Sequence, residues 1–416
     1  MSDYVKELVA KARESSYKLA NLTTKQKNKA LLAMAKELLS NKSFILKENR
    51  KDLSAARRNH LSESFIDRLT LDDKRLKEMS ESLKEVARLK DPVGETLSSK
   101  KRPNGMIVKK VRVPIGVVLI VYEARPNVTS DCVSLLFKAS NVGILRGGKD
   151  AVNSNRAIGK VLQKALEKAG LKFPVFFVIE KTGHDVVDKL LKQSDYIDLV
   201  IPRGGESLIK KVVESSRIPV IKHYKGVCHI FVDASADVDR SLKICINAKA
   251  QRPSVCNAVE TILVHKSIAK KFLPLLKEKF DALGVEIRAD SRALKIIPGV
   301  KKADEQDWSR EYLSLIVSIK IVDNIDQAIK HINTYSSRHT DSILSKNTHN
   351  SNKFVKEVDS ACCFINISTR FSDGYQFGLG AEIGISTDKL HARGPMGLEE
   401  LTTYKYIVTG SGQIRK

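Results

Sequence analysis

The first 90 residues repeat apolar and charged positions with the period of an α-helix. One apolar face stands out because Lys and Glu occupy the opposite side; it carries Leu31, Leu32, Met34, Ala35, Leu38 and Leu39. Apolar residues three and four positions apart share one face of a helix. We therefore expect this part of the chain to be helical.

A different pattern lies between Lys100 and Val113. The segment KKRPNGMIVKKVRV contains the turn-forming triplet Pro-Asn-Gly, after which apolar and basic residues alternate. Alternation with a period of two is typical of a strand with one exposed face, and Asn-Gly favours a tight turn. The segment predicts an exposed β-hairpin.

Beyond residue 115, short apolar runs alternate with stretches of helical period. The clearest helix ends at Gly170 and carries on one stripe Ile158, Val161, Leu162, Ala165, Leu166 and Ala169. Apolar strands separated by amphipathic helices are typical of a mostly parallel sheet covered on both faces. The predicted strands are 115–122, 142–145, 175–179, 197–201 and 220–221.

A second series of the same kind starts after Gly226. It predicts a strand at 229–233, a helix near 237–250, a strand at 260–265, a helix at 268–283, and further elements at 313–322, 325–332 and 362–367. We infer a second α/β domain, and the chain shows no internal repeat or low-complexity segment.

Composition adds a strong positive charge. The 416 residues include 72 Lys and Arg against 48 Asp and Glu, which gives a net charge of +24. Such a charge attracts anions, including nucleic acids and phosphorylated metabolites or cofactors. The basic residues are spread over most of the chain, however, and few aromatic side chains are available for base stacking. A lysine-rich solvated surface explains most of the excess.

The cysteines, the histidines and the N-terminal segment indicate a cytoplasmic protein without metal. None of the six cysteines forms a C-x-x-C pair, and the nine histidines show no metal-binding pattern. The first 20 residues lack the apolar core of a signal peptide, and no apolar run approaches the roughly 18 residues that span a bilayer. We expect neither a disulfide framework nor a membrane partner.

Two glycine pairs lie where a predicted strand gives way to a helix. Gly147 and Gly148 occur in ILRGGKD, and Gly204 and Gly205 in LVIPRGGES, whereas neither common nucleotide motif is present and GLGAEIG at 378–384 has the wrong spacing. Free N–H groups and the helix dipole favour an anion at such a junction, although a tight turn without a ligand is an equally good explanation for either pair alone. The flanking cations favour phosphate binding; they are Arg146, Lys149 and Arg203.

One cysteine is a candidate nucleophile. Cys256 lies in QRPSVCNAVE, a Pro-interrupted stretch between a predicted helix and a predicted strand, and Arg252 is close enough in sequence to favour the thiolate. Asn127 in RPNVT follows a predicted strand, and its side-chain amide is suited to donate to an oxyanion. The alternatives are a small buried cysteine and an ordinary turn asparagine.

Seven long segments together resemble one family, the γ-glutamyl phosphate reductases (glutamate-5-semialdehyde dehydrogenases) of the aldehyde dehydrogenase superfamily. They are VRVPIGVVLIVYEARPNVTSD, ILRGGKDAVNSN, LVIPRGGESL, GVCHIFVD, NAKAQRPSVCNAVETILVH, NISTRFSDGYQFGLGAEIGIS and KLHARGPMGLEELTTYKY. Because these segments are long, ordered and widely spaced, a chance match is far less likely than for a short motif.

The resemblance implies an aldehyde dehydrogenase-like α/β fold. A Rossmann-like NADP-binding domain would comprise 1–98 and 115–225, a catalytic domain 226–395, and a small β oligomerisation flap 99–114 and 396–416. It also implies the second step of proline biosynthesis, in which NADPH reduces L-glutamyl 5-phosphate to L-glutamate 5-semialdehyde and phosphate is released. A homo-oligomer is expected; its size and an association with the upstream glutamate kinase stay open.

The resemblance also assigns roles to individual residues. Cys256 corresponds to the nucleophile, which would form a thioester, and Asn127 to the oxyanion-hole amide. Arg146 corresponds to a residue that contacts the adenosine ribose, and Glu311 to the glutamate that contacts the nicotinamide ribose. Lys149 stands where NAD-using relatives carry a carboxylate. A cation at this position favours the 2′-phosphate of NADP.

Two positions depart from the wider pattern. Hydrolytic aldehyde dehydrogenases carry a glutamate general base where VIKHYKG places Lys222 or His223. Without that carboxylate, water beside an acyl-enzyme stays unactivated, and a cation there helps to hold phosphate. Tyr375 stands where the family is expected to have glycine.

Charge and proximity to the motifs suggest four candidates for the phosphate site: Arg252, Lys222, His223 and Arg370. Each is equally well explained as a solvated surface cation. The alternatives for the whole protein are a hydrolytic or CoA-acylating aldehyde dehydrogenase, and a nucleic-acid-binding protein built on a retired enzyme fold. The residues that bind the substrate's α-amino and α-carboxylate groups do not follow from the sequence.

Overall fold

The computed structural model describes residues 2–181, 183–222 and 225–415. The chain forms two compact units. Unit 1 comprises 1–222, 378–384 and 396–416, and unit 2 comprises 223–377 and 385–395. The predicted boundary near residue 225 falls close to the passage from unit 1 to unit 2, while 378–384 from the predicted catalytic domain belongs to unit 1.

Unit 1 begins with five helices, as the apolar periodicity predicts. They are α1 (Ser2–Leu19), α2 (Thr24–Ser40), α3 (Lys42–Arg58), α4 (Glu63–Leu69) and α5 (Asp73–Arg88). Helix α2 begins with a capping box, in which Thr23 and Gln26 satisfy each other's backbone N–H groups. The predicted apolar face of α2 is buried at Leu31, Met34, Ala35 and Leu38, whereas Leu32 and Leu39 are exposed.

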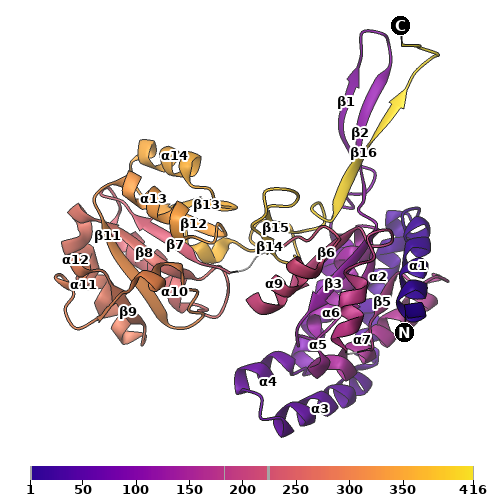
Figure 1. The fold of residues 1–416 in the computed structure, drawn as a ribbon, viewed down its shortest axis with the longest axis horizontal. Coiled ribbons are helices and arrows are strands. Elements are labelled where there is room, and N and C mark those ends of the chain that lie inside the picture. Colours follow the sequence, from indigo (N-terminus) through magenta and orange to yellow (C-terminus); the bar gives the residue numbers. More distant parts are fainter. Residues whose placement is uncertain (1, 182, 223–224, 416) are drawn as a thin grey trace. The chain divides into compact units, whose positions relative to one another are not determined.

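A four-stranded parallel sheet forms the centre of unit 1 (Figure 1). Its strands are β3 (Val117–Tyr122), β4 (Val142–Arg146), β5 (Phe176–Val178) and β6 (Leu199–Arg203), in the order β5-β4-β3-β6. The connecting helices are α6 (Asn127–Lys138), η1 (Lys149–Ala151), α7 (Val152–Lys168), α8 (His184–Leu190) and α9 (Glu206–Ser215). The predicted strand at 220–221 is wrong. Val220 makes only an isolated bridge to Val200, and the pairing does not extend to a strand.

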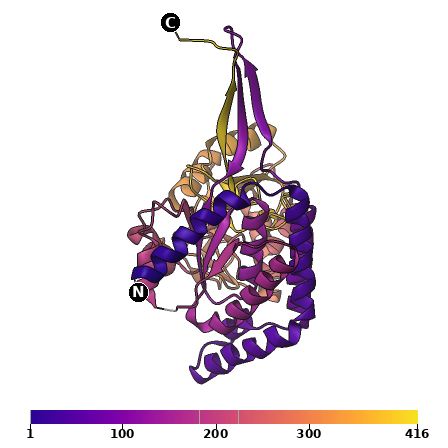
Figure 2. The ribbon, with the colours of Figure 1, turned by 90° about the vertical axis from the view of Figure 1, so that its right-hand side faces the viewer.

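The predicted hairpin is confirmed, and a strand from 396–416, the second segment of the flap that the resemblance implies, pairs with it. β1 (Thr96–Lys101) and β2 (Ile107–Pro114) are antiparallel, and β16 (Thr402–Thr409) pairs with β2 along its whole length. Figures 1 and 2 both show the three strands side by side as a narrow ribbon. All of β1 is exposed, and so is β16 after its first residue, which leaves a strand edge open to another chain.

Unit 2 is built on a seven-stranded parallel sheet in the order β10-β9-β11-β8-β7-β12-β13. Its strands are β7 (Cys228–Val232), β8 (Val259–His265), β9 (Glu286–Ala289), β10 (Lys301–Lys302), β11 (Ile316–Val322), β12 (Thr340–Leu344) and β13 (Cys362–Ile365). Unit 2 also contains a separate antiparallel pair of short strands, β14 (Ile385–Ser386) and β15 (Gly394–Pro395).

Helices cover both faces of this sheet, as predicted. One core cluster includes side chains of α10 (Val238–Ala250) and α11 (Lys266–Ala282), and a second includes those of α13 (Ile325–Tyr335) and α14 (Thr348–Glu357). The remaining helices are short: α12 (Ser291–Leu294), η2 (Glu305–Ser309) and η3 (Thr369–Phe371). The mixed α/β class and the parallel sheets are therefore confirmed.

Candidate active site

Cys256 lies in the loop that connects α10 to β8 in unit 2, and its side chain is half-buried. The N–H of Ala258 donates to the carbonyl of Val255 at 3.0 Å, which closes a tight turn around the cysteine. The Cys256 carbonyl accepts a hydrogen bond from the Cys228 thiol at 3.2 Å. Burial raises the pKa of Cys228 well above that of a free thiol, so this second cysteine stays a neutral donor.

Gly226 joins the cysteine to Glu311. A methyl group on Gly226 would lie 1.9 Å from the Cys256 carbonyl oxygen, so only glycine allows this approach. The Gly226 N–H donates to Glu311 Oε1 at 2.8 Å. The loop of the nucleophile and the carboxylate predicted to contact the cofactor are therefore fixed by one residue. The sequence feature that could have indicated this contact is the glycine of GVCHIFVD, which lies just before a buried strand.

Arg370 is held beside the cysteine loop. Its guanidinium contacts the side-chain oxygen of Asn257, the residue after Cys256, and its Nε donates to Gln251 Oε1 at 2.9 Å. Asn257 in turn donates to the Ser372 carbonyl at 2.8 Å. Burial is the main cause that lowers the pKa of Arg370, and the positive charge of Arg252 lowers it further. The structure thus brings together Cys256, Arg252 and Arg370 as a positively charged site suited to a phosphorylated acyl group.

Asn127 begins helix α6 in unit 1, and Asp131 orients its amide. Asn127 Nδ2 donates to Asp131 Oδ2 at 3.0 Å, one turn further along the helix. Burial raises the pKa of Asp131 to about 6, against hydrogen bonds from Asn127 and Ser82. A primary amide has two N–H donors, so one can hold its orientation while the other serves a ligand. The pairing of Asn127 with Cys256 spans the two units and stays a prediction.

Three cations predicted to bind the cofactor lie at one edge of the unit 1 sheet. Arg146 ends β4 and Arg203 ends β6, both at the carboxyl ends of parallel strands, and Lys149 follows as an exposed residue in η1. Ligands of open α/β sheets bind at this edge, where the strand order reverses; here the reversal lies between β3 and β6. Three cations there suit a phosphorylated dinucleotide, so the residues fit this cofactor.

The chain's own carboxylates occupy helix N-termini next to both glycine pairs. Asp52 accepts hydrogen bonds from the N–H groups of Asn153 and Ser154 at the start of α7, at 3.2 and 2.8 Å. Glu123 Oε1 accepts from the Gly205 N–H at 2.8 Å at the start of α9. These N–H groups are therefore already paired, which weakens the reason for predicting phosphate there. Cofactor binding by Gly147, Gly148, Gly204 and Gly205 stays a prediction.

The GLGAEIG segment has a packing role in unit 1. Gly384 has φ 154°, and a methyl group on it would come within 2.3 Å of an Arg203 guanidinium nitrogen. Gly380, with φ 73°, packs in the same way against Leu89. These glycines let 378–384 lie against the predicted cofactor edge, and the sequence alone gave no indication of this contact.

The structure describes two of the three remaining candidates, Lys222 and Tyr375. Lys222 is half-buried at the end of unit 1, and His223 lies outside the described residues. Tyr375 is exposed, and its N–H donates to Asp373 at 3.0 Å.

Within the described residues, no group of three or more His, Cys, Asp or Glu is arranged to hold a metal ion. No helix of the described chain is long and apolar enough to cross a membrane.

Comparison with known proteins identifies the family. The aldehyde dehydrogenase family model matches residues 2–310. A γ-glutamyl phosphate reductase of Caldanaerobacter subterraneus is 54% identical over 98% of each chain, and one of Geobacter metallireducens is 51% identical over 100% of each. The crystal structure of γ-glutamyl phosphate reductase from Thermotoga maritima superposes with a TM-score of 0.97 at 47% identity, covering 99% of this chain and 100% of that one. The chain therefore belongs to the aldehyde dehydrogenase family, in its γ-glutamyl phosphate reductase branch.

Proposed function

We propose that the protein reduces L-glutamyl 5-phosphate to L-glutamate 5-semialdehyde with NADPH and releases phosphate, the second step of proline biosynthesis from glutamate. The observation that carries the proposal is the Arg370 guanidinium, fixed by Asn257 directly beside the Cys256 turn. An acyl phosphate needs both a nucleophile and a cation for its leaving group, and unit 2 provides both within one set of contacts.

In this mechanism the Cys256 thiolate attacks the γ-carbonyl carbon of the substrate. The Asn127 amide and the Cys256 N–H donate hydrogen bonds to the developing oxyanion. Arg370 and Arg252 bind the phosphate as it leaves, and Lys222 and His223 are further candidates for this role. A thioester on Cys256 remains.

A nicotinamide cofactor, when bound, would supply the hydride that reduces this thioester. Glu311 would hold the nicotinamide ribose, and Arg146, Lys149 and Arg203 would hold the adenosine ribose and the phosphates. Lys149 gives the preference for NADP, because a cation attracts the 2′-phosphate and a carboxylate repels it. Collapse of the thiohemiacetal then frees the Cys256 thiolate and the aldehyde.

The exposed three-stranded ribbon of β1, β2 and β16 is the surface that we assign to homo-oligomer formation. Its open edges present unpaired backbone N–H and C=O groups, which suits strand pairing with a second copy. Glutamyl phosphate, phosphate and the cofactor are the expected small-molecule partners, and the cytoplasm is the expected compartment.

The test is the reverse reaction. We expect glutamate 5-semialdehyde to reduce NADP only when inorganic phosphate is present, and more slowly with NAD. Intact-mass spectrometry should detect the glutamyl thioester on the wild-type chain and lose it in Cys256→Ala. NADP reduction that is independent of phosphate would instead support a hydrolytic enzyme, and undiminished turnover in Cys256→Ala would end the covalent mechanism.

A further inference from the structure

A buried lysine–glutamate pair in unit 2 has no part in the chemistry just described. Lys249 of α10 and Glu260 of β8 are both fully buried, and Lys249 Nζ lies 2.6 Å from Glu260 Oε2. Removing two charges from water costs several kcal/mol per ion, and only good geometry and further hydrogen bonds offset this cost. Burial lowers the pKa of Lys249 and raises that of Glu260 to about 7. What distinguishes this pair is the segment that its carboxylate also contacts.

The second oxygen of Glu260 contacts the segment that carries Glu311. Glu260 Oε1 accepts a hydrogen bond from the Leu313 N–H at 3.3 Å. Leu313 has φ 53°, a left-handed conformation that costs a residue with a side chain about 1–2 kcal/mol. Leu313 is 45% exposed, so apolar burial offsets little of this cost. Glu260 therefore holds the backbone two residues after Glu311 in a conformation that the segment does not favour by itself.

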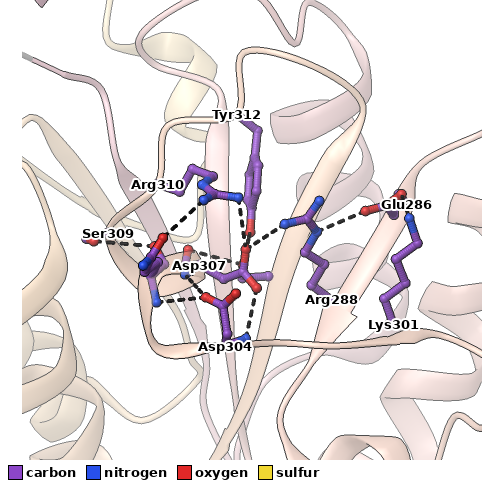
Figure 3. A network of polar contacts seen from close by, with 10 residues as sticks. Glu286, Arg288, Lys301, Asp304, Asp307, Ser309, Arg310 and Tyr312 are labelled. Carbon is purple, nitrogen blue, oxygen red and sulfur yellow. Dashed lines mark hydrogen bonds and ion pairs between the residues drawn. The ribbon is translucent and has the colours of Figure 1, made fainter.

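Tyr312 fixes the same segment from its side chain. Figure 3 shows its hydroxyl directed at Asp307, to which it donates a hydrogen bond at 2.8 Å, and Ser318 Oγ lies 2.7 Å from the same hydroxyl. Arg288 also donates to Asp307, and its guanidinium lies 5.2 Å from the centre of the Tyr312 ring. Lys249 Nζ lies 5.9 Å from that ring. Both anchors thus meet on the residues next to Glu311.

Glu311 lies between Arg310 and these two anchored residues, in a stretch without helix or strand. Its carboxylate accepts the hydrogen bond from Gly226, which packs against Cys256. A loop of this kind keeps a carboxylate in a defined place only when its backbone is held, and a misplacement of 1 Å in an active site costs roughly 100-fold in rate.

We propose that Lys249, Glu260 and Tyr312 are positioning residues that fix the Glu311 carboxylate for its contact with the nicotinamide ribose of the cofactor. The inference rests on the proposed function, which assigns that contact to Glu311. None of the three residues is required to touch the cofactor. The charged pair is retained because Lys249 orients Glu260, and Glu260 holds the strained Leu313 backbone.

Glu260→Gln tests the proposal. The amide replaces one acceptor oxygen with an NH2 group, so the variant cannot accept from both Lys249 Nζ and the Leu313 N–H. We expect the Kd of NADPH, from a fluorescence titration, and its KM to rise at least about tenfold. The yield of the Cys256 thioester formed without cofactor should stay close to that of the wild-type protein.

Tyr312→Phe gives a milder second variant, which removes one hydroxyl and keeps the ring. It should raise the NADPH Kd in the same direction by about threefold or more, since a lost hydrogen bond costs about 0.5–1.5 kcal/mol. If Glu260→Gln fails to fold, this variant decides the question.

A matched control exists in unit 1. Lys27 and Asp91 form a similarly buried pair at 2.5 Å, with side-chain exposures of 1% and 6%. Asp91→Asn should lower the thermal midpoint about as much as Glu260→Gln and leave the NADPH Kd unchanged. An NADPH Kd within twofold of wild type in both Glu260→Gln and Tyr312→Phe would overturn the proposal. Absence of NADP-dependent turnover in the wild-type protein would instead remove the proposed function.

Discussion

The backbone of Cys256 lies against Gly226 so closely that a side chain on Gly226 would overlap three Cys256 atoms. An added methyl carbon would be 1.9 Å from the carbonyl oxygen and 2.5 Å from both the carbonyl carbon and the Cα. The obstacle is backbone rather than a flexible side chain, so the loop of the nucleophile has to move. The position of the sulfur therefore depends on the absence of a side chain 30 residues earlier.

Gly226→Ala should therefore impair chemistry. We expect kcat of the phosphate-dependent reaction to fall by about 100-fold or more, because a displacement near 1 Å has this effect in active sites. Gly299→Ala is the control in the same unit, since Gly299 has φ 87° and open space around it. The control should lose about 1–2 kcal/mol of stability and keep its kcat. A kcat within threefold of wild type in Gly226→Ala would contradict the assigned contact.

Arg370→Gln should weaken phosphate binding. The substitution removes the charge beside Asn257 and Gln251, and a hydrogen bond to a charged group contributes about 1.5–3 kcal/mol. We expect the KM for phosphate in the semialdehyde-driven reaction to rise by roughly 10- to 100-fold, with little change in the KM for NADP.

Arg292→Gln provides the matched control for Arg370. Arg292 lies on the surface of the same unit and pairs with Asp323 at 3.0 Å, so the same charge is lost away from Cys256. Arg370→Lys should recover only part of the phosphate affinity, because an ammonium group does not reproduce the planar arrangement of the guanidinium donors. Equal phosphate KM values in the two Gln variants would exclude Arg370 from the phosphate site.

Asn127→Ala should lower kcat by roughly 10²- to 10³-fold, the usual effect of removing one oxyanion donor. Asp131→Ala should lower kcat by a smaller factor, because it removes only the acceptor that orients the Asn127 amide at 3.0 Å. Asp195→Ala, at an exposed position of the same unit, is the control. Steady-state kinetics with an unchanged kcat in Asn127→Ala would exclude this amide from the oxyanion hole.

Much of the fold follows from periodicity in the sequence. The apolar runs that became β3 and β4 are buried on both sides, and a central strand of a parallel sheet needs just such a continuous run. The prediction failed at 220–221 because two apolar residues do not determine how long a pairing extends. Strands β9 and β10 were not predicted, since strands of four and two residues that carry charged side chains leave almost no periodic signal.

The sequence identifies candidate reactive groups but not the residues that hold them in place. Cys256, Arg252 and Arg370 follow from chemistry and resemblance, because thiols and guanidinium groups are recognisable by type. The sequence did not indicate the roles of Asp52, Glu123 and Asn257. Each of them forms a hydrogen bond to a segment that is distant in the sequence, and such a contact depends on how the chain folds. Asp52 caps a helix 101 residues further along the chain, and no local pattern encodes that distance.

Substitutions on one face of β16 should weaken the proposed oligomer. Alternation along the strand places Tyr404, Tyr406 and Val408 on the same face, and Tyr406 and Val408 are 62% and 55% exposed. Tyr406→Lys with Val408→Lys should shift the sedimentation coefficient toward that of a monomer. Thr403→Lys with Thr409→Lys, on the opposite face, is the control. An oligomer that withstands the first pair would place the interface elsewhere.

A buried histidine should make unit 2 sensitive to acid. His331 packs against Trp308 and Tyr335, and burial, with smaller effects of His229 and Lys320, lowers its pKa to about 2. The unfolded chain regains a pKa near 6.5, so below that pH the unfolded state binds a proton that the folded state does not. The free energy of unfolding therefore falls as the pH drops through 6.5, by about 1.4 kcal/mol per pH unit for this residue.

His331→Phe keeps an aromatic ring and removes the titration. Between pH 7 and pH 5, its free energy of unfolding should fall by about 2 kcal/mol less than that of the wild-type protein. Urea titrations followed by the fluorescence of Trp308, the single tryptophan of the chain, report directly on this unit. His349→Phe, at an exposed position, should keep the wild-type pH dependence. Parallel pH profiles for His331→Phe and the wild-type protein would mean that His331 is charged in the folded state, and the neutral packing described here would then be wrong.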